Sequence, residues 1–192
     1  MRMLLSVILL AAGLSKRMGD DKLLMSYNGI PLLQVAVDLL GSIEAHEKII
    51  VTTGKRLKHV TLPQGIRAVI NKNRSKGISS SIHLGALNAA GTHFMFMAAD
   101  QPKLRASDIT QIIKTSKENP DKIVYPVISN KPCLPSIFPE CLKNELLTIT
   151  GDIGGRSIRE KHPELAVPVI PACPENFIDI DTPKELYDIS QH

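Results

Sequence analysis

Short apolar runs alternate along this chain with longer segments in which apolar residues recur at helical spacing. This alternation is typical of βαβ units that build a mostly parallel sheet. The run Leu4 to Leu10 is continuously apolar, as expected for a strand covered on both faces. The pattern therefore predicts an α/β fold, with strands at 4–10, 48–53, 66–70, 93–99, 122–126, 167–170 and 177–180.

Helical spacing fills most of the gaps between these runs. We expect helices over 31–40, 79–90, about 107–117, 142–147 and from 183 to the C-terminal region. Ser107 and Asp108 are candidate caps of the third helix, and Thr182 is the candidate cap of the last. The stretch 130–138 is interrupted by prolines and predicts irregular structure.

Size and composition favour a single soluble domain spanning residues 1–192. The chain is 43% hydrophobic, which is enough to bury a substantial core, and 22% charged. The net charge of +4 suits an anionic partner. Tryptophan is absent, aromatics are 4%, and no dense Lys/Arg block occurs, so nucleic acid is not an expected partner.

The cysteines and the N-terminus both indicate a cytoplasmic protein. Cys133, Cys141 and Cys173 are widely spaced, which disfavours a disulfide framework or a cysteine zinc site. Met1 to Leu14 is similar to a short signal peptide, but a charged loop follows it instead of a cleavage site. We therefore interpret it as a buried first strand, and no segment is predicted to cross a membrane.

The loop after this first strand is the most informative stretch. Ligands bind at the carboxyl ends of strands in open α/β sheets, and glycines let the backbone approach them closely. Gly13, Ser15, Arg17 and Lys22 suit phosphate oxygens, although an ordinary glycine-containing loop with solvated charges is the alternative. Neither a Walker loop nor a dinucleotide fingerprint is present.

Three carboxylates lie at or near the ends of other predicted strands. Asp100 ends the strand 93–99, and Asp179 and Asp181 flank Ile180 near the C-terminus. Magnesium ions in proteins prefer one or two carboxylates together with waters and substrate phosphates. Each of these acids could instead serve only as a turn or helix cap.

Two further polar clusters are candidates for ligand contact. Gly77 precedes Ser79, Ser80 and Ser81 at a predicted helix start, where backbone N–H groups are available to an anion. A serine cap is the ordinary alternative. The glycine-rich turn 151–156 contains Asp152 and Arg156, and it carries little information alone.

Five motifs together resemble one family. LAAGLSKRMGDDKLL, GISSSIHLGA, AADQP, GDIGGR and FIDIDTPKEL occur in this order and resemble the motifs of molybdopterin nucleotidyltransferases, specifically the molybdenum cofactor cytidylyltransferases. The resemblance implies a Rossmann-like, three-layer nucleotidyltransferase domain. It also implies transfer of CMP from CTP to molybdopterin, with release of pyrophosphate. Guanylyl-specific relatives usually read Leu-Ala-Gly-Gly where this chain has Ala12, so CTP is expected over GTP.

The resemblance also assigns roles by position. Arg17, Lys22 and Asp100 become the expected catalytic residues, and Asp100 and Asp181 the expected Mg²⁺ ligands. Residues on the acceptor side would be Leu134, Asp152, Arg156 and Asp179. The nucleotide would contact Leu10, Ala11, Ala12, Gly13, Ser15, Arg17, Lys22, Ser79, Ser80 and Ser81.

One departure from the family pattern leaves the acceptor open. Relatives commonly carry Gly-His-Pro or Gly-Asn-Pro where this chain has Cys133-Leu134-Pro135. A guanylyl or other nucleotidyltransferase acting on a sugar or polyol phosphate is therefore one alternative. Another is a non-catalytic factor that delivers the molybdenum cofactor. A transient contact with a molybdenum hydroxylase is the one protein partner that the resemblance suggests.

Overall fold

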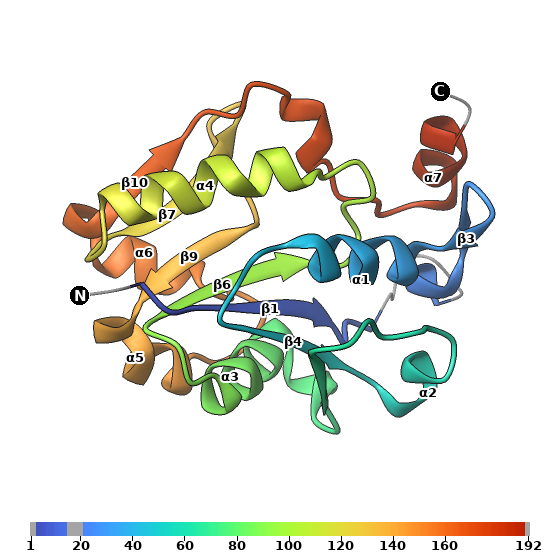
Figure 1. Ribbon diagram of the computed structural model, residues 1–192, viewed down its shortest axis with the longest axis horizontal. Helices are drawn as coiled ribbons and strands as arrows, with labels where there is room; N and C mark the ends of the chain where they lie inside the picture. The colour runs from blue at the N-terminus through green and yellow to red at the C-terminus, as the bar shows by residue number, and fades with distance from the viewer. Residues whose placement is uncertain (1–2, 15–20, 191–192) are drawn as a thin grey trace.

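A central β-sheet with helices on both faces organises the chain (Figure 1). The computed structural model describes residues 3–14 and 21–190. In these ranges the main sheet has the strand order β10-β7-β9-β6-β1-β4-β5, with β8 paired to β7. Its strands are β1 (Leu5–Ala11), β4 (Glu47–Thr52), β5 (Ile66–Ile70), β6 (His93–Ala98), β7 (Ile123–Ile128), β8 (Lys131–Pro132), β9 (Ser136–Pro139) and β10 (Ala166–Val169).

Four neighbouring strands of the sheet run parallel to one another. β1 pairs in parallel with β4 and β6, and β4 pairs in parallel with β5. Their carboxyl ends therefore meet at one edge, where the loops after β1 and β6 begin. The expected α/β class with a mostly parallel sheet is confirmed.

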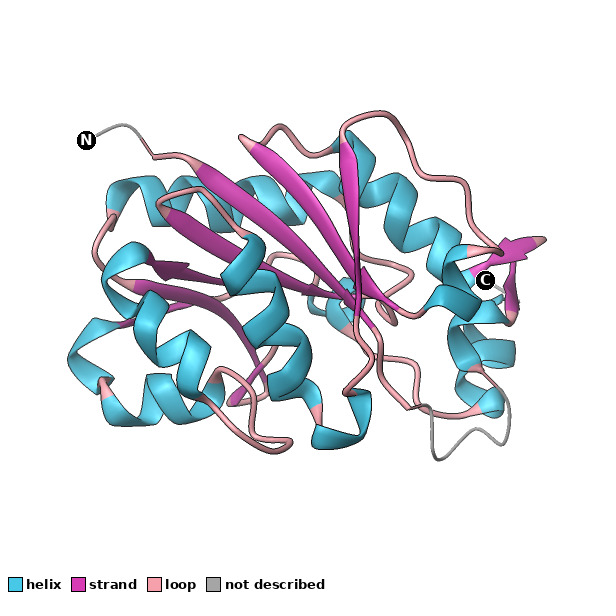
Figure 2. Cartoon of the chain, turned by 90° about the horizontal axis from the view of Figure 1, so that it is seen from below, coloured by secondary structure: helices cyan, strands magenta, loops and turns pink. Residues whose placement is uncertain are grey.

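Helices bury their apolar faces on the two sides of this sheet. The helices are α1 (Leu32–Ser42), α2 (Gly54–Leu57), α3 (Ile78–Asn88), α4 (Ala106–Glu118), α5 (Lys143–Thr148), α6 (Arg156–Lys161) and α7 (Pro183–Ser190). In Figure 1, α1 and α4 lie above the sheet, while α3 and α5 lie below it. Two separate hydrophobic clusters result, one on each face, and Figure 2 shows the twisted strands between the helical layers.

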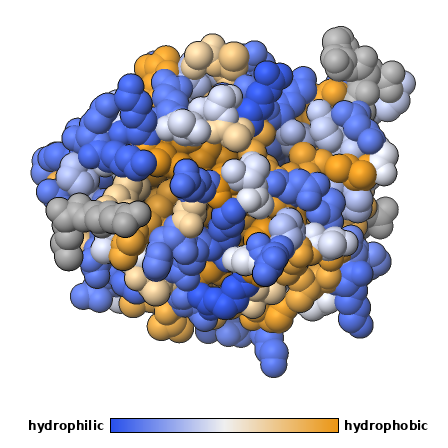
Figure 3. Space-filling view, in the orientation of Figure 1, coloured by the Kyte–Doolittle hydropathy of each residue, from blue (hydrophilic) through white to orange (hydrophobic). Residues whose placement is uncertain are grey.

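β1 lies in the middle of the sheet, as expected for a buried first strand. Val7, Ile8 and Leu9 are fully buried, with Val7 and Leu9 in one cluster and Ile8 in the other. The face of the molecule seen in Figure 3 is mixed, with apolar side chains gathered toward its middle among hydrophilic ones. In the described part of the chain, no helix has the length and apolarity needed to cross a membrane.

The stretch expected to be irregular, 130–138, contains a central strand. β9 runs antiparallel to both β6 and β7, and all four of its residues are buried. Prolines 132, 135 and 139 obscured this strand in the sequence, since proline is disfavoured inside sheets. Here Pro139 occupies the last position of β9, where the pairing ends.

Two other expectations were wrong. Residues 177–180 do not form a strand: a short 3-10 turn, η5 (Pro174–Phe177), is followed by irregular backbone. Ile180 donates its N–H to the carbonyl of Asp100 at 2.9 Å, while Ile178 and Asp179 are exposed, so no ladder forms. The expected cap at Ser107 is the second, because α4 begins at Ala106 and its N-cap is Arg105. Asp108 does cap this helix, since its carboxylate accepts the Arg105 N–H at 2.9 Å from inside the first turn.

Candidate active site

A cleft of about 370 Å³ opens at the carboxyl ends of β1 and β6. Segments from distant parts of the sequence line it, because the parallel strands deliver their following loops to the same edge. The lining residues are Leu10, Ala12, Gly13, Leu14, Lys22, Leu23, Arg74, Ser75, Gly77, Ile78, Ser81, Ala98, Ala99, Asp100, Leu134, Asp152 and Asp181.

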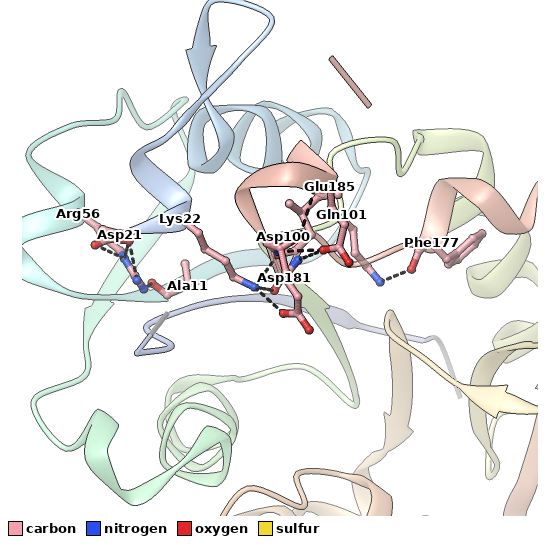
Figure 4. Close-up of polar contacts among 11 residues, drawn as sticks. Ala11, Asp21, Lys22, Arg56, Asp100, Gln101, Phe177, Asp181 and Glu185 are labelled. Atoms are coloured by element: carbon pink, nitrogen blue, oxygen red, sulfur yellow. Dashed lines mark hydrogen bonds and ion pairs between the residues drawn. The ribbon is translucent and has the colours of Figure 1, made fainter. Parts of the chain in front are cut away.

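Lys22 joins the acidic end of this cleft to the loop after β1. Its Nζ lies 2.6 Å from Oδ2 of Asp100 and 3.2 Å from Oδ1 of Asp181, and it donates to the carbonyl of Ile180 at 2.9 Å. Figure 4 shows Lys22 directed toward both carboxylates. Burial alone would lower the pKa of Lys22, but the charge and hydrogen bond of Asp100, and then those of Asp181, raise it above 10.5. The ammonium therefore stays charged.

Asp179 lies close to this acidic group without contacting Lys22. Although the residue as a whole is exposed, its carboxyl group is partly removed from water by the surrounding protein. This burial, followed by the negative charge of Asp100, raises the pKa of Asp179 to about 6. Crowding of like charges disfavours ionisation. Asp179, expected on the acceptor side, is not among the residues that line the cleft, although its charge acts on the acidic group there.

The start of α3 forms the opposite wall. Gly77 has a φ of +87°, and the carboxylate of Asp152 accepts the N–H of Ile78 at 3.1 Å. Ser79 donates its N–H to the carbonyl of Gly151 at 3.2 Å. Asp152, expected on the acceptor side, is thus a cap of α3 that also faces the cleft.

The three expected serines do not share one environment. Asn71 donates its Nδ2 group to the hydroxyls of both Ser80 and Ser81 at 2.9 Å, which ties α3 to the end of β5. Only Ser81 lines the cleft, and the side chain of Ser79 turns back to the carbonyl of Lys76. Ser79 and Ser80 therefore support the wall from behind.

The other residues expected at the site are likewise divided between the lining of the cleft and positions away from it. Leu10, Ala12, Gly13 and Leu134 line the cleft, whereas Ala11 is fully buried behind it. Arg156 is exposed and pairs with Glu160 at 2.6 Å, one turn along α6, so it is not brought to the cleft. Ser15 and Arg17 lie outside the described residues.

Several residues of the site were missed in the sequence. Arg74 and Ser75 line the cleft from the loop before α3. Gln101 donates to the carbonyls of Leu134 and Phe177, which holds two neighbouring segments under Asp100. Arg56 binds Asp21 behind the first loop. A signal existed for Arg56, since it is a cation at the ligand edge just after the second predicted strand.

The acidic end of the cleft fits a divalent cation. Asp100 and Asp181 both contact Lys22 Nζ, so the two carboxylates lie next to each other, with the ammonium at the point where their oxygens meet. No group of three or more His, Cys, Asp or Glu residues suited to a metal occurs among the described residues. Two carboxylates completed by water and phosphate oxygens are the arrangement that Mg²⁺ prefers.

The fold and the cleft together define a class. The α/β nucleotidyltransferases have this combination of a largely parallel sheet, a glycine-containing loop after its first strand, and a partly buried lysine beside paired carboxylates at one edge. The chain belongs to the MobA-like NTP transferase domain family, whose model matches residues 7–166.

Known relatives agree with this membership. A Trichormus variabilis protein named probable molybdenum cofactor guanylyltransferase is 27% identical over 191 residues, which cover 95% of this chain and 88% of that protein. A nucleotidyl transferase from Methanothermobacter superposes with a TM-score of 0.79 at 21% identity, over 98% and 97% of the two chains. A manganese complex of Rv0371C from Mycobacterium tuberculosis gives 0.75 at 18% identity, over 99% of both chains. The likeness to these two structures extends over the whole fold.

Proposed function

We propose that this protein transfers CMP from CTP to the terminal phosphate of molybdopterin or molybdenum cofactor and releases pyrophosphate. One observation carries the proposal: Lys22 Nζ, Asp100 and Asp181 meet at one end of a cleft bordered by Ala12 and Gly13. The relatives named for molybdenum cofactor guanylyl transfer support this class of acceptor.

The proposed reaction needs positioning and charge more than covalent help from the protein. An oxygen of the acceptor phosphate attacks the α-phosphorus of the nucleotide, and the bond from that phosphorus to the bridging oxygen of pyrophosphate breaks. The phosphate nucleophile is already ionised near neutral pH, so no general base is required. Lys22, with Arg17 as its proposed partner, stabilises the charge that grows on pyrophosphate.

The carboxylates Asp100 and Asp181 are the proposed metal ligands. A divalent ion, when bound, supplies positive charge to phosphate oxygens. We propose Mg²⁺ because the converging donors are hard oxygens, and the manganese complex of a protein with this fold supports a divalent cation in general.

The choice of base rests on the first loop. Ala12 is buried and lines the cleft, and its methyl group narrows the base region compared with glycine. A pyrimidine needs less room than a purine, which favours CTP. GTP is the second candidate, because the curated relatives are named guanylyltransferases.

The acceptor is the other specific choice in the proposal. Leu134 lines the cleft at the position where relatives commonly carry a polar residue, so a sugar phosphate is the competing acceptor. Transient docking to a molybdenum hydroxylase that takes the product completes the proposal.

A two-way panel tests the proposal. The purified protein is incubated with Mg²⁺ and each of CTP, GTP, ATP and UTP, together with either molybdopterin or a set of sugar phosphates. We expect pyrophosphate release for CTP with molybdopterin. Release only with a sugar phosphate would remove the molybdopterin acceptor, and preference for GTP would remove the cytidylyl assignment. Cofactor binding that ignores every nucleotide would indicate a delivery protein.

A further inference from the structure

Arg56 is a charged side chain in the interior of the protein, next to the cleft but outside its lining. It belongs to α2, directly after β4, and only 1% of its side chain is exposed. The hydroxyl of Thr53 accepts the Arg56 N–H at 3.2 Å and fixes the start of this short helix. A buried cation is unfavourable unless it is paired and hydrogen-bonded, so its partners are informative.

The guanidinium of Arg56 binds both ends of the loop that follows β1. Nε donates to both carboxylate oxygens of Asp21 at 2.9 Å, and Nη2 lies 2.7 Å from Oδ1. Nη1 donates to the carbonyl of Ala11 at 2.8 Å. Figure 4 shows Arg56, Asp21 and Ala11 grouped on the side of Lys22 that faces away from Asp100 and Asp181.

These contacts hold the two residues that directly precede the lining of the cleft, Ala11 and Asp21. Ala11 is the last residue of β1, and Ala12 and Gly13, which line the cleft, follow it directly. Asp21 immediately precedes Lys22, whose Nζ reaches Asp100. A single planar cation therefore sets the separation of the two backbone segments that present the loop and the lysine. Lysine could not replace it, because an ammonium lacks the fixed fork of donors.

We propose that Arg56 is a positioning residue for nucleotidyl transfer, acting through Asp21 to hold Lys22 at the phosphates. The inference rests on the proposed function, since it assigns to Arg56 a place in that same reaction. Displacement of a reacting or stabilising group by about 1 Å costs about 100-fold in rate. Loss of the ion pair between Arg56 and Asp21 should therefore lower kcat far more than it weakens binding of the nucleotide base.

The variants are Arg56→Lys, Arg56→Met and Asp21→Asn, measured in the full chain for melting temperature, kcat and KM. Glu47→Gln is the control, because it removes a different charged group, one that is partly buried at the opposite end of the sheet and far from the cleft. We expect kcat to fall about 100-fold in the Arg56 and Asp21 variants, with KM for the nucleotide changed less than fivefold. The control should lose melting temperature and keep kcat.

A second measurement separates positioning from general support of the fold. If Arg56 acts through Lys22, then Arg56→Lys in a Lys22→Met background should reduce kcat by less than threefold further, because residues that act as a unit are not additive. Amide hydrogen exchange over residues 22–24 should rise in Arg56→Lys relative to the control. This readout does not require turnover.

The outcomes are distinguishable. Normal kcat in folded Arg56 and Asp21 variants, or full additivity with Lys22→Met, would overturn the positioning role while the enzyme assignment stands. Absence of turnover and of nucleotide binding in the unmodified protein would overturn the proposed function. In that case, unchanged exchange over residues 22–24 in Arg56→Lys would also overturn the proposal that Arg56 holds Lys22 in place through Asp21.

Discussion

The ammonium nitrogen of Lys22 lies 2.6 Å from Oδ2 of Asp100, although 78 positions separate the two residues in the sequence. Their contact follows from the parallel pairing of β1 with β6, which brings the segments after both strands to one edge. Had they lain on opposite sides of the molecule, no triphosphate could have contacted both. This relationship is the geometric basis of the predictions about the cleft.

Asp100→Asn should abolish most nucleotidyl transfer and leave the protein folded. The substitution keeps the shape of the side chain but removes the charge that pairs with Lys22 and is proposed to bind the cation. We expect kcat/KM to fall by about 100-fold to 1000-fold, the range seen when one electrostatic stabiliser is removed. Nucleotide-dependent pyrophosphate release measures it, with circular dichroism to check the fold.

Asp38→Asn is the matched control for this substitution. Asp38 is an exposed aspartate on α1, where its carboxylate accepts a hydrogen bond from Gln34. Its activity should stay within twofold of the unmodified protein. Unchanged turnover in Asp100→Asn would contradict the role of Asp100.

Ala12→Gly should relax the choice of base. Removal of the methyl group widens the cleft at a buried lining position, so we expect the ratio of kcat/KM for GTP over CTP to rise by about tenfold, the order expected for one methyl-sized change in an apolar pocket. Steady-state kinetics with both nucleotides provide the measurement. An unchanged ratio would show that Ala12 does not take part in base recognition.

Much of the fold could be predicted from the sequence because its central strands are covered on both faces. Continuous apolar runs such as 7–11 and 94–98 are short enough to favour strands over helices, and the structure places the buried strands β1 and β6 there. β9 and the segment after Phe177 could not be predicted in the same way. Proline masked the former, and the latter is apolar because Phe177 and Ile180 pack into the core without any strand pairing.

The sequence could predict a site residue only where the neighbouring segment of the chain determines its position. Lys22 and Asp100 were predicted at the ligand edge because each follows an apolar strand. Asp181 was predicted there from a strand at 177–180 that the structure does not contain, yet it still lines the cleft. Arg156 was expected in the cleft from a motif alone, but its helical position turns it to Glu160 and solvent. The Arg56 and Asp21 pair depends on how α2 packs behind β1, which no short sequence pattern encodes.

Gly77→Ala should destabilise the protein more than Gly65→Ala. Both glycines have nearly the same positive φ, +87° and +86°, a value that residues with a side chain rarely adopt. A Cβ at Gly77 would collide with the Asp152 carboxylate and lie 2.6 Å from the Gly151 carbonyl oxygen, whereas a Cβ at Gly65 meets nothing within 4 Å. We expect about 1 kcal/mol for Gly65→Ala and at least about 2 kcal/mol for Gly77→Ala.

Urea unfolding measures both free energies of unfolding. Because the collision displaces Asp152 from the N-terminus of α3, Gly77→Ala should also weaken nucleotide binding at the cleft, and Gly65→Ala should not. Equal losses of stability in the two variants would show that the backbone conformation alone explains the glycine at position 77.

The carboxylate of Glu47 should make the free energy of unfolding depend on pH in the acidic range. Partial burial works to raise the pKa of Glu47, but hydrogen bonds from Ser6 and the Ala90 N–H, followed by Arg67, outweigh it and lower the pKa below 4.5. A lowered folded-state pKa means that the stabilisation is present above the unfolded value and is lost as the pH falls through the folded value. The relevant window therefore lies below about pH 4.5.

Glu47→Gln isolates this contribution. The amide keeps the shape of the side chain but loses the charge that receives these donors, so we expect a loss of about 1–2 kcal/mol at pH 7. The difference from the unmodified protein should shrink as the pH falls from 4.5 to 3, because the glutamic acid then becomes neutral as well. Urea denaturation across that range measures it, and a difference that stays constant with pH would mean that the charge of Glu47 does not stabilise the fold.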